Sequence, residues 1–301
     1  MRLQIASDLH LEARPKAVYR ELLDPGVAPC LALLGDVAPL NHPNLRPFLE
    51  WCSEHWETVI WIPGCLELLG PGSGNEGASA AAGASPDLAA AVARAKAVAE
   101  PFWNVTVLDH EGMVSTDGIY IFGLPFWRFP PESSDEHRVL SKAPTGFVWH
   151  PGYFRYVEAE PSPAAPEFLR AEYNRDLRWL KQTVKTQTEP IIILSHYGPT
   201  PWIQEEGFVG DPDRSTTFPD VEELLKAPVV AWLCGHCHQS TLFQKEWADI
   251  TGAKGTVLIA NNPKGLPFEN AAYRRDAVVR IDPALYGRAP GAGGGRPAPY
   301  V

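Results

Sequence analysis

The sequence lacks two features that would point to a polymeric or membrane partner. It has no block of Lys and Arg, and its 26 basic residues face 36 acidic ones, for a formal net charge of −10. Binding to a nucleic-acid backbone needs clustered basic residues that displace counterions, so no nucleic-acid partner is expected. No apolar run is long enough to cross a bilayer, so no membrane partner is expected either. A small-molecule substrate remains, and no residue pattern indicates an oligomeric state.

An export signal and a disulfide framework are also missing. The N-terminus passes from a short strand pattern directly into a polar cluster, without the long apolar core of a signal peptide. Five scattered cysteines, an odd number, favour a reducing compartment over disulfide pairing. We therefore expect a cytoplasmic protein. With 301 residues, of which 45% are hydrophobic, the chain can bury one large core or two small ones.

Strand and helix patterns alternate along the chain and predict an α/β sheet architecture. Strands are expected at residues 3–6, 30–34, 58–62, 105–108, 119–123, 190–194, 230–234, 256–260 and 277–281. Helices are expected at residues 47–56, 87–100, 165–186 and 218–226. Residues 71–86 are rich in Gly, Ser and Ala, which predicts a mobile insert within one domain of residues 1–288. Gly and Pro dominate residues 289–301, which predicts a disordered tail.

Five predicted strand ends carry side chains that metal ions use as ligands. They are Asp8 with His10, Asp36, Cys65, His196, and His236 with His238. The carboxyl edge of a sheet is where open α/β folds place their sites. Residues two apart in an extended segment point the same way, so each pair would face one centre together. One such strand end has ordinary explanations, such as a helix cap at Asp36, but five in one chain favour a metal site.

The segment from Cys234 to His238 has three interpretations when it is taken alone. Its Cys-Gly-His-Cys-His order has the spacing of a c-type haem attachment site, and its first four residues have the spacing of a redox dithiol. In the third interpretation the two histidines are metal ligands and the cysteines take no part. The missing export signal counts against haem, because c-type haem is normally attached outside the cytoplasm. The local sequence does not separate the other two interpretations.

The order of these motifs resembles the calcineurin-like metallophosphoesterase superfamily over residues 2–282. Segments 7–12, 126–127 and 262–265 are similar to a small bacterial and fungal-type branch of that family. The resemblance implies a two-layer β core flanked by helices, two divalent metal ions (manganese, zinc or iron), and hydrolysis of a small phosphoester or phosphoanhydride. It implies one ion on Asp8, His10 and His238, a second on His196 and His236, and Asp36 between them. Cys237 would then point away from the ions, and Cys234 would lie in a buried strand, which disfavours the dithiol.

The sequence departs from the family pattern at Gly64-Cys65-Leu66-Glu67, where the family has Gly-Asn-His-Glu or Gly-Asn-His-Asp. In the family the Asn is a ligand of the second ion, and the His acts on the leaving group. Leu66 cannot transfer a proton, and loss of a general acid typically costs roughly 10²–10⁴-fold in rate. Cys65 has two interpretations. It is a thiolate ligand that favours zinc or iron, or a small buried thiol beside a site completed by water.

Two further residues near these motifs are candidates for substrate contact. Tyr197 follows His196 where the branch often has another His, and either substrate contact or packing would explain it. Arg128 lies in an aromatic-rich loop, as a phosphate clamp or as a surface ion pair. The changes at Cys65 and Leu66 leave two alternatives to a phosphate hydrolase. One is a metalloenzyme with non-phosphate chemistry, a lyase or another hydrolysis, and the other is a catalytically inactive metal-binding pseudo-phosphatase.

Overall fold

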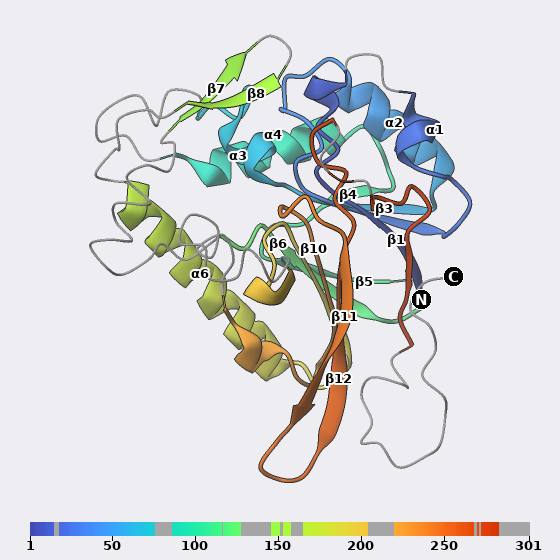
Figure 1. The fold of residues 1–301 in the computed structure, drawn as a ribbon, viewed down its shortest axis with the longest axis vertical. Helices are drawn as coiled ribbons and strands as arrows, with labels where there is room; N and C mark the ends of the chain where they lie inside the picture. The colour runs from blue at the N-terminus through green and yellow to red at the C-terminus, as the bar shows by residue number, and fades with distance from the viewer. Residues whose placement is uncertain are drawn as a thin grey trace.

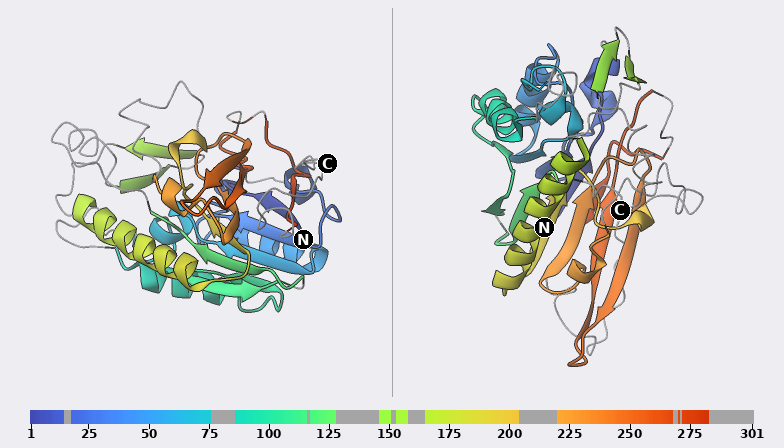
Figure 2. Two further views of the ribbon diagram at one scale, coloured as in Figure 1. Left: turned by 90° about the horizontal axis from the view of Figure 1, so that it is seen from below. Right: turned by 90° about the vertical axis from the view of Figure 1, so that its left-hand side faces the viewer.

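A computed structural model describes residues 1–14, 18–75, 86–115, 117–127, 146–150, 153–157, 165–203, 220–267, 270 and 272–282. Two β-sheets lie face to face, and helices cover the outer face of each sheet (Figure 1, Figure 2). This arrangement confirms the expected two-layer β core flanked by helices. A separate two-stranded hairpin is formed by β7 (Gly146–His150) and β8 (Tyr153–Val157).

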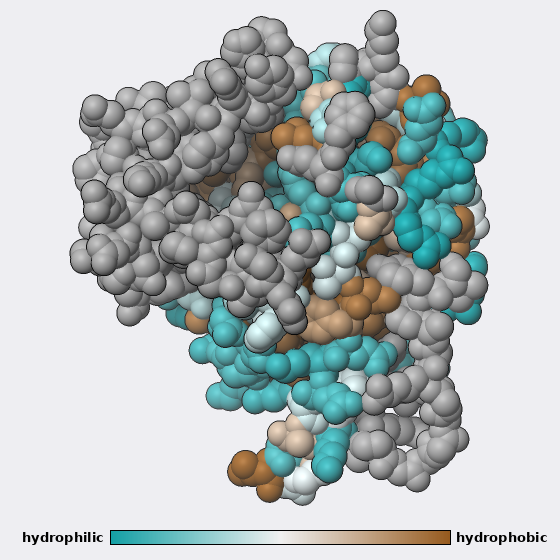
Figure 3. Space-filling view, viewed as in Figure 1, coloured by the Kyte–Doolittle hydropathy of each residue, from teal (hydrophilic) through white to brown (hydrophobic). Residues whose placement is uncertain are grey.

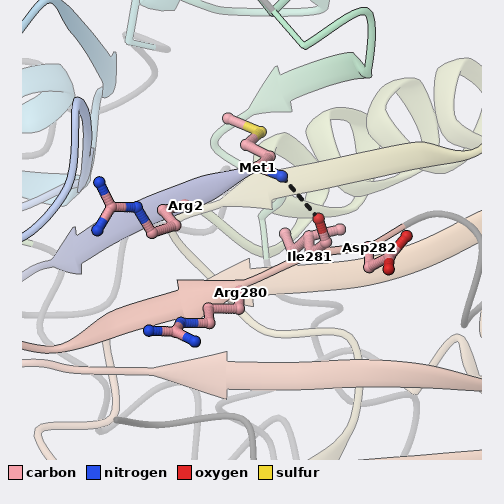
Figure 4. A pocket seen from close by; sticks show the side chains of 5 residues that line it. All are labelled: Met1, Arg2, Arg280, Ile281 and Asp282. Atoms are coloured by element: carbon pink, nitrogen blue, oxygen red, sulfur yellow. Dashed lines mark hydrogen bonds between the residues drawn. The ribbon is translucent and has the colours of Figure 1, made fainter. Parts of the chain in front are cut away.

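The first sheet is built by the N-terminal strands, with a late strand added at its edge. Its order is β13-β1-β2-β3-β4, in which β1 to β4 run parallel and β13 is antiparallel to β1. The strands are β1 (Arg2–Ala6), β2 (Cys30–Leu34), β3 (Thr58–Ile62), β4 (Val105–Val107) and β13 (Val278–Arg280). At the β13 edge Arg2 pairs with Arg280, and the Met1 amine donates to the Ile281 carbonyl at 2.9 Å (Figure 4). The first strand and the last described strand are thereby joined at the edge away from β4.

The second sheet has the order β11-β12-β10-β9-β6-β5, with its four middle strands parallel and both edge strands antiparallel. The strands are β5 (Glu111–Val114), β6 (Tyr120–Leu124), β9 (Ile191–Ser195), β10 (Val229–Cys234), β11 (Thr241–Ala248) and β12 (Lys254–Asn261). The β11–β12 hairpin extends past the rest of the sheet (Figure 1). Its far end is mixed in hydropathy on the face seen in Figure 3, with one apolar group beside hydrophilic residues, and Ile250 in that turn is fully exposed.

Successive side chains of the parallel strands point alternately to the core between the two sheets and to the core between a sheet and its helices. Ala32 and Leu34 of β2 pack between the sheets, while Leu31 and Leu33 pack against the helices. The helical elements are α1 (Tyr19–Leu22), α2 (Leu45–His55), α3 (Cys65–Leu69), α4 (Leu88–Ala99), α6 (Ala165–Thr186), and the 3₁₀ turns η1 (Leu11–Ala13), η2 (Pro201–Ile203) and η5 (Glu222–Leu224). Because both faces are covered, the strands are apolar almost throughout, as parallel strands require.

Most of the expected elements are confirmed, and one is wrong. The helix expected at residues 165–186 has those bounds, and Asp87 caps the next-longest helix by accepting from Ala90 N at 2.9 Å. In the described part of the helix expected at 218–226, η5 is a single 3₁₀ turn. The backbone there is bonded elsewhere, with Val221 N donating to Pro199 O and Val229 N to Lys226 O, both at 2.9 Å. The missed elements are strands β5, β7, β8 and β11, the short helices α1 and α3, and the 3₁₀ turns η1 and η2.

The expected mobile insert at residues 71–86 is described only at its two ends. Residues 76–85 lie outside the described residues, as do Arg128 and the predicted tail at 289–301. Ser73 and Asn75 are buried, and the Asn75 side chain donates to Leu68 O at 2.8 Å and accepts from Asp87 N at 2.8 Å. The described ends are therefore fixed to α3 and α4. Among the described residues no helix is both long and apolar enough to span a bilayer.

Candidate metal centre

The carboxyl ends of strands from both sheets meet at one end of the sandwich. His236 N donates to Asp8 Oδ2 at 2.9 Å, and His196 Nδ1 lies 2.9 Å from Leu34 O, so residues after β9 and β10 touch residues at the ends of β1 and β2. Gly35 has a φ of 87°, and a Cβ there would collide with the His196 ring. Glycine at this position is what allows the ends of the two sheets to approach so closely.

The seven ligand-type residues predicted from the sequence fall into two groups, each with ligand atoms within 4.8 Å of one another. The first cluster is Asp8, His10 and His238, and the second cluster is Asp36, Cys65, His196 and His236. The clusters adjoin, because the backbone N–H of His236 in the second bonds to Asp8 in the first. The structure thus places every predicted ligand in one centre and places Cys65 among the ligand atoms of the second cluster.

In the first cluster His10 and Asp8 are each held by a partner that leaves one ligand atom facing inward. His10 Nδ1 donates to Glu12 Oε1 at 2.8 Å, which turns His10 Nε2 toward His238 Nε2 at 3.2 Å. Asp8 Oδ1 is buried without a hydrogen bond and lies 3.4 Å from His238 Nε2. A carboxylate behind a ligating imidazole is the usual outer partner in protein metal sites. Glu12 was not predicted, although its position two residues after His10 was a usable signal.

The second cluster is oriented in the same way. His196 Nδ1 donates to Leu34 O, which leaves Nε2 as the acceptor of the neutral imidazole; this buried nitrogen has no hydrogen-bond partner and lies 3.6 Å from Asp36 Oδ2. Asp36 Oδ1 accepts from Leu66 N at 2.8 Å. Burying an acceptor without a partner costs about 1–3 kcal/mol, which a bound cation would offset. Unpartnered acceptors in both clusters, among carboxylate, imidazole and sulfur donors, fit two divalent ions.

The pKa shifts in the centre also indicate that its carboxylates favour a nearby positive charge. Burial alone would raise the pKa of Asp8, but His238, with smaller effects from His196 and His10, lowers it. Burial works against protonation of His196 and His10, yet Asp36 raises the pKa of the first and Glu12 that of the second. Burial also raises the pKa of the Cys65 thiol. Cations would replace these protons, since bound metals require neutral imidazoles and a deprotonated thiol.

The backbone that carries these ligands is turned, which corrects the expectation of extended segments. The described non-glycine residues with positive φ include five of the candidate ligands: Asp8 (52°), His10 (46°), Asp36 (52°), His236 (71°) and His238 (53°). An extended chain would aim His236 and His238 at one point, whereas the left-handed turns send them to different clusters. Each such residue costs roughly 1–2 kcal/mol, and strain of this kind collects at functional sites.

Beside the second cluster, Leu66 is apolar and Glu67 is used in hydrogen bonds to the backbone. The Leu66 side chain is 2% exposed and offers no proton donor. The Glu67 carboxylate accepts from backbone N–H groups of Gly64, Asp36 and Val37, which ties the loops after β2 and β3 together. The Tyr197 hydroxyl lies 3.1 Å from Cys65 Sγ. Tyr197 had been expected to contact substrate or to pack, and the hydroxyl contact to sulfur was not predicted.

The buried Asp176 holds Trp127, a residue that packs beside Cys65. Asp176 of α6 is fully buried and accepts from Trp127 N at 2.8 Å and from His110 Nε2 at 2.7 Å. Trp127 packs with Cys65 and Tyr197 in one hydrophobic cluster. The Cys237 thiol donates to Gln239 O at 3.2 Å and accepts from Asn261 Nδ2 at 2.7 Å, so it is engaged outside both clusters.

Comparisons with known proteins give the fold and a distant relative. No family model matches the sequence. An uncharacterized protein of Acanthamoeba polyphaga mimivirus is 20% identical over 302 residues, which cover 94% of this chain and 98% of that protein. Phosphopantetheinyl hydrolase (PptH) of Mycobacterium tuberculosis has a similar structure, with a TM-score of 0.59, 19% identity, and coverage of 89% of this chain and 90% of that one. This likeness shows that the chain has the fold of a phosphoesterase-like sandwich.

Proposed function

We propose that the protein is a dinuclear metal-dependent hydrolase of a small phosphoester or phosphoanhydride that works without the usual histidine acid. The observation that carries the proposal is the pair of buried acceptors, Asp8 Oδ1 and His196 Nε2, one in each adjoining cluster and both without a hydrogen bond. The fold shared with a protein named as a hydrolase supports the same reaction class. A cytoplasmic location is supported by the five cysteines, which are all unpaired thiols.

The residues present assign the two ions to different ligand sets. Asp8, His10 and His238 would hold the first ion, and Cys65, His196 and His236 would hold the second, with Asp36 beside both histidines of the second cluster. Thiolate is a soft ligand, so the second site favours zinc or iron over manganese or magnesium. When bound, such a pair of ions supplies an acidic water for attack on phosphorus and neutralises charge on the phosphoryl oxygens.

The protein's own groups determine how well that centre is prepared and which substrates suit it. Glu12, Leu34 O and Leu66 N hold His10, His196 and Asp36 in single orientations, so little reorganisation is needed on binding. Leu66 gives no proton to a departing group. We therefore expect substrates whose leaving group is already a weak base, such as an anhydride or an activated ester.

The test combines metal analysis with a substrate panel. Metal content per chain is measured by plasma mass spectrometry. Hydrolysis is then assayed with manganese, zinc or iron on phosphate monoesters, diesters, anhydrides and a phosphopantetheinyl ester, the last chosen from the name of the structural neighbour. Two ions per chain and faster turnover of anhydrides and activated esters than of alkyl esters are expected. Two bound ions with every rate at background, in the parent and in Asp36→Asn alike, would contradict a phosphate hydrolase.

The buried Leu66 favours a second candidate, a metal-binding protein without phosphatase activity or with non-phosphate chemistry. Leu66→His separates the two. In a phosphate hydrolase that lacks its acid, the added imidazole is expected to raise the rate for substrates with poor leaving groups by up to roughly 10²–10⁴-fold. In the second candidate it leaves phosphate ester hydrolysis at background.

A further inference from the structure

Two of the three positions at which the sequence departs from the family pattern near the second cluster are in direct contact. Cys65 stands at the family's Asn position, and Tyr197 stands where the branch often has His. The Tyr197 hydroxyl lies 3.1 Å from Cys65 Sγ, although the residues are 132 positions apart in the chain. Both side chains are buried, at 6% and 5% exposure, so water does not compete freely for this hydrogen bond.

Contacts of the Tyr197 backbone and ring hold its hydroxyl beside Cys65. The backbone N–H of Tyr197 donates to Pro125 O at 3.1 Å, and the Tyr197 carbonyl accepts from the Ser195 hydroxyl. The Ser195 oxygen in turn accepts from Trp232 Nε1 at 2.8 Å. The Tyr197 ring lies 4.1 Å from the His236 ring and 5.3 Å from the His196 ring, centroid to centroid, with edge contact to His196. The ring therefore touches both imidazoles of the second cluster.

We propose that Tyr197 is a positioning residue of the second metal site, whose hydroxyl donates a hydrogen bond to Cys65 Sγ and so holds that sulfur as a thiolate ligand. The proposal rests on the metal centre proposed above. A thiolate has lone pairs for both an ion and a hydrogen bond, and a donor to an anionic acceptor makes roughly twice as strong a bond as a neutral pair. An Asn carbonyl is neutral and has less need of such a donor, so the two departures form one functional unit.

The experiment titrates metal-free protein with Co²⁺, whose complexes with thiolate show a sulfur-to-metal absorption band. The parent is expected to bind two ions and to show the band, and Cys65→Ala is expected to lose it. Tyr197→Phe keeps the ring packing and removes only the hydroxyl. It is expected to shift or weaken the band and to lower the affinity of the thiolate site roughly 10–100-fold, the usual cost of losing an outer partner. Tyr173→Phe, which alters another buried tyrosine of the core, serves as the matched control and leaves both unchanged.

A second pair of variants separates donation to sulfur from any other role of the hydroxyl. In a Cys65→Asn background the sulfur is absent, so adding Tyr197→Phe is expected to change Co²⁺ affinity little, whereas a hydroxyl that acts on another group would cause the same loss in both backgrounds. Equal losses, or a Tyr197→Phe protein with the parent band and affinity, would overturn the role of Tyr197 while the metal centre stands. A band that survives Cys65→Ala would overturn thiolate ligation. A parent that binds no Co²⁺ would overturn the metal centre itself, and this proposal with it.

Discussion

The two ligand clusters share one plan and differ in the group that stands behind a key ligand. In the first cluster the Glu12 carboxylate accepts a hydrogen bond from His10 Nδ1, which makes a neutral imidazole a stronger ligand. In the second cluster the Tyr197 hydroxyl contacts Cys65, where a donor would steady an anionic ligand. The outer partner is an acceptor where the inner ligand is neutral and a donor where it would be charged. The two sites are therefore expected to differ in metal preference and in their response to mutation.

The largest effect is expected from Asp36→Asn, which removes the carboxylate of the second cluster. The carboxylate lies 3.6 Å from His196 Nε2 and is held by Leu66 N. Metal affinity of the second site is expected to fall by more than roughly 100-fold, beyond the usual cost of losing an outer partner. Calorimetric metal titration checks this, with Asp109→Asn as a control carboxylate outside the clusters. Parent affinity at both sites in Asp36→Asn would show that Asp36 is not a ligand.

Cys65→Asn would give the second cluster the residue of the pattern that the sequence resembles, and would remove the sulfur that distinguishes it from the first cluster. Without sulfur, the second site is expected to lose its preference for zinc over manganese, because amide oxygen is a hard ligand. The change in the zinc-to-manganese affinity ratio is expected to reach roughly 10–100-fold, while the first site keeps its ratio. Competition titrations with the two metals measure both ratios. An unchanged ratio at the second site would make Cys65 a bystander.

Glu12→Gln would weaken the first cluster alone. The amide still fills the space but binds His10 Nδ1–H less strongly than a carboxylate does. Affinity of the first site is expected to fall roughly 10–100-fold, with the second site unaffected. Glu222→Gln, which removes a carboxylate from a surface pair with Lys245, is the matched control. Equal losses at both sites would contradict independent outer partners.

The smallest effect concerns stability around Trp127, the residue that packs beside the second cluster. Burial alone would lower the pKa of His110, but Asp109 and Asp176 raise it to about 9. Because the folded pKa lies above the unfolded value of about 6.5, this stabilisation is complete below pH 6.5 and is lost as pH rises through 9. Between pH 6.5 and 10 the parent should lose up to about 3 kcal/mol of unfolding free energy relative to His110→Asn. Asparagine tolerates the φ of 54° at this position. Parallel denaturant curves for the two proteins would contradict the ion pair.

Much of the fold could be predicted from the local pattern of apolar and polar residues. Where the prediction failed, the reason can be found in the residues concerned. Five-residue apolar runs such as Cys30–Leu34 predicted buried parallel strands because both faces of such strands are covered. Strand β11 was missed because its residues are mixed in polarity and only partly buried at the edge of the sheet. The length of the helix expected at residues 218–226 was overestimated. Backbone hydrogen bonds to residues outside the turn end it on either side, and the local sequence gives no sign of them.

The candidate ligands could also be predicted, because each follows a buried strand and has a side chain of ligand type. Their direction could not be predicted, because it depends on left-handed turns at Asp8, His10, Asp36, His236 and His238. L-residues rarely adopt that conformation, so local sequence rules assign such segments an extended path. The structure groups the predicted residues as the resemblance implied, with His236 and His238 in different clusters, although an extended path alone would have aimed both at one point.

By itself, the sequence determined the alternation of strands and helices and the identity of the side chains at five strand ends, since both depend on the order of apolar and polar residues along short segments. The two-layer core and the division of the ligands between two ions were implied by the family resemblance. Only the tertiary structure decided that His10 faces His238 across 228 positions and that Tyr197 lies against Cys65. Such contacts form between the ends of two different sheets. They arise from the packing of the sandwich as a whole, which no local pattern records.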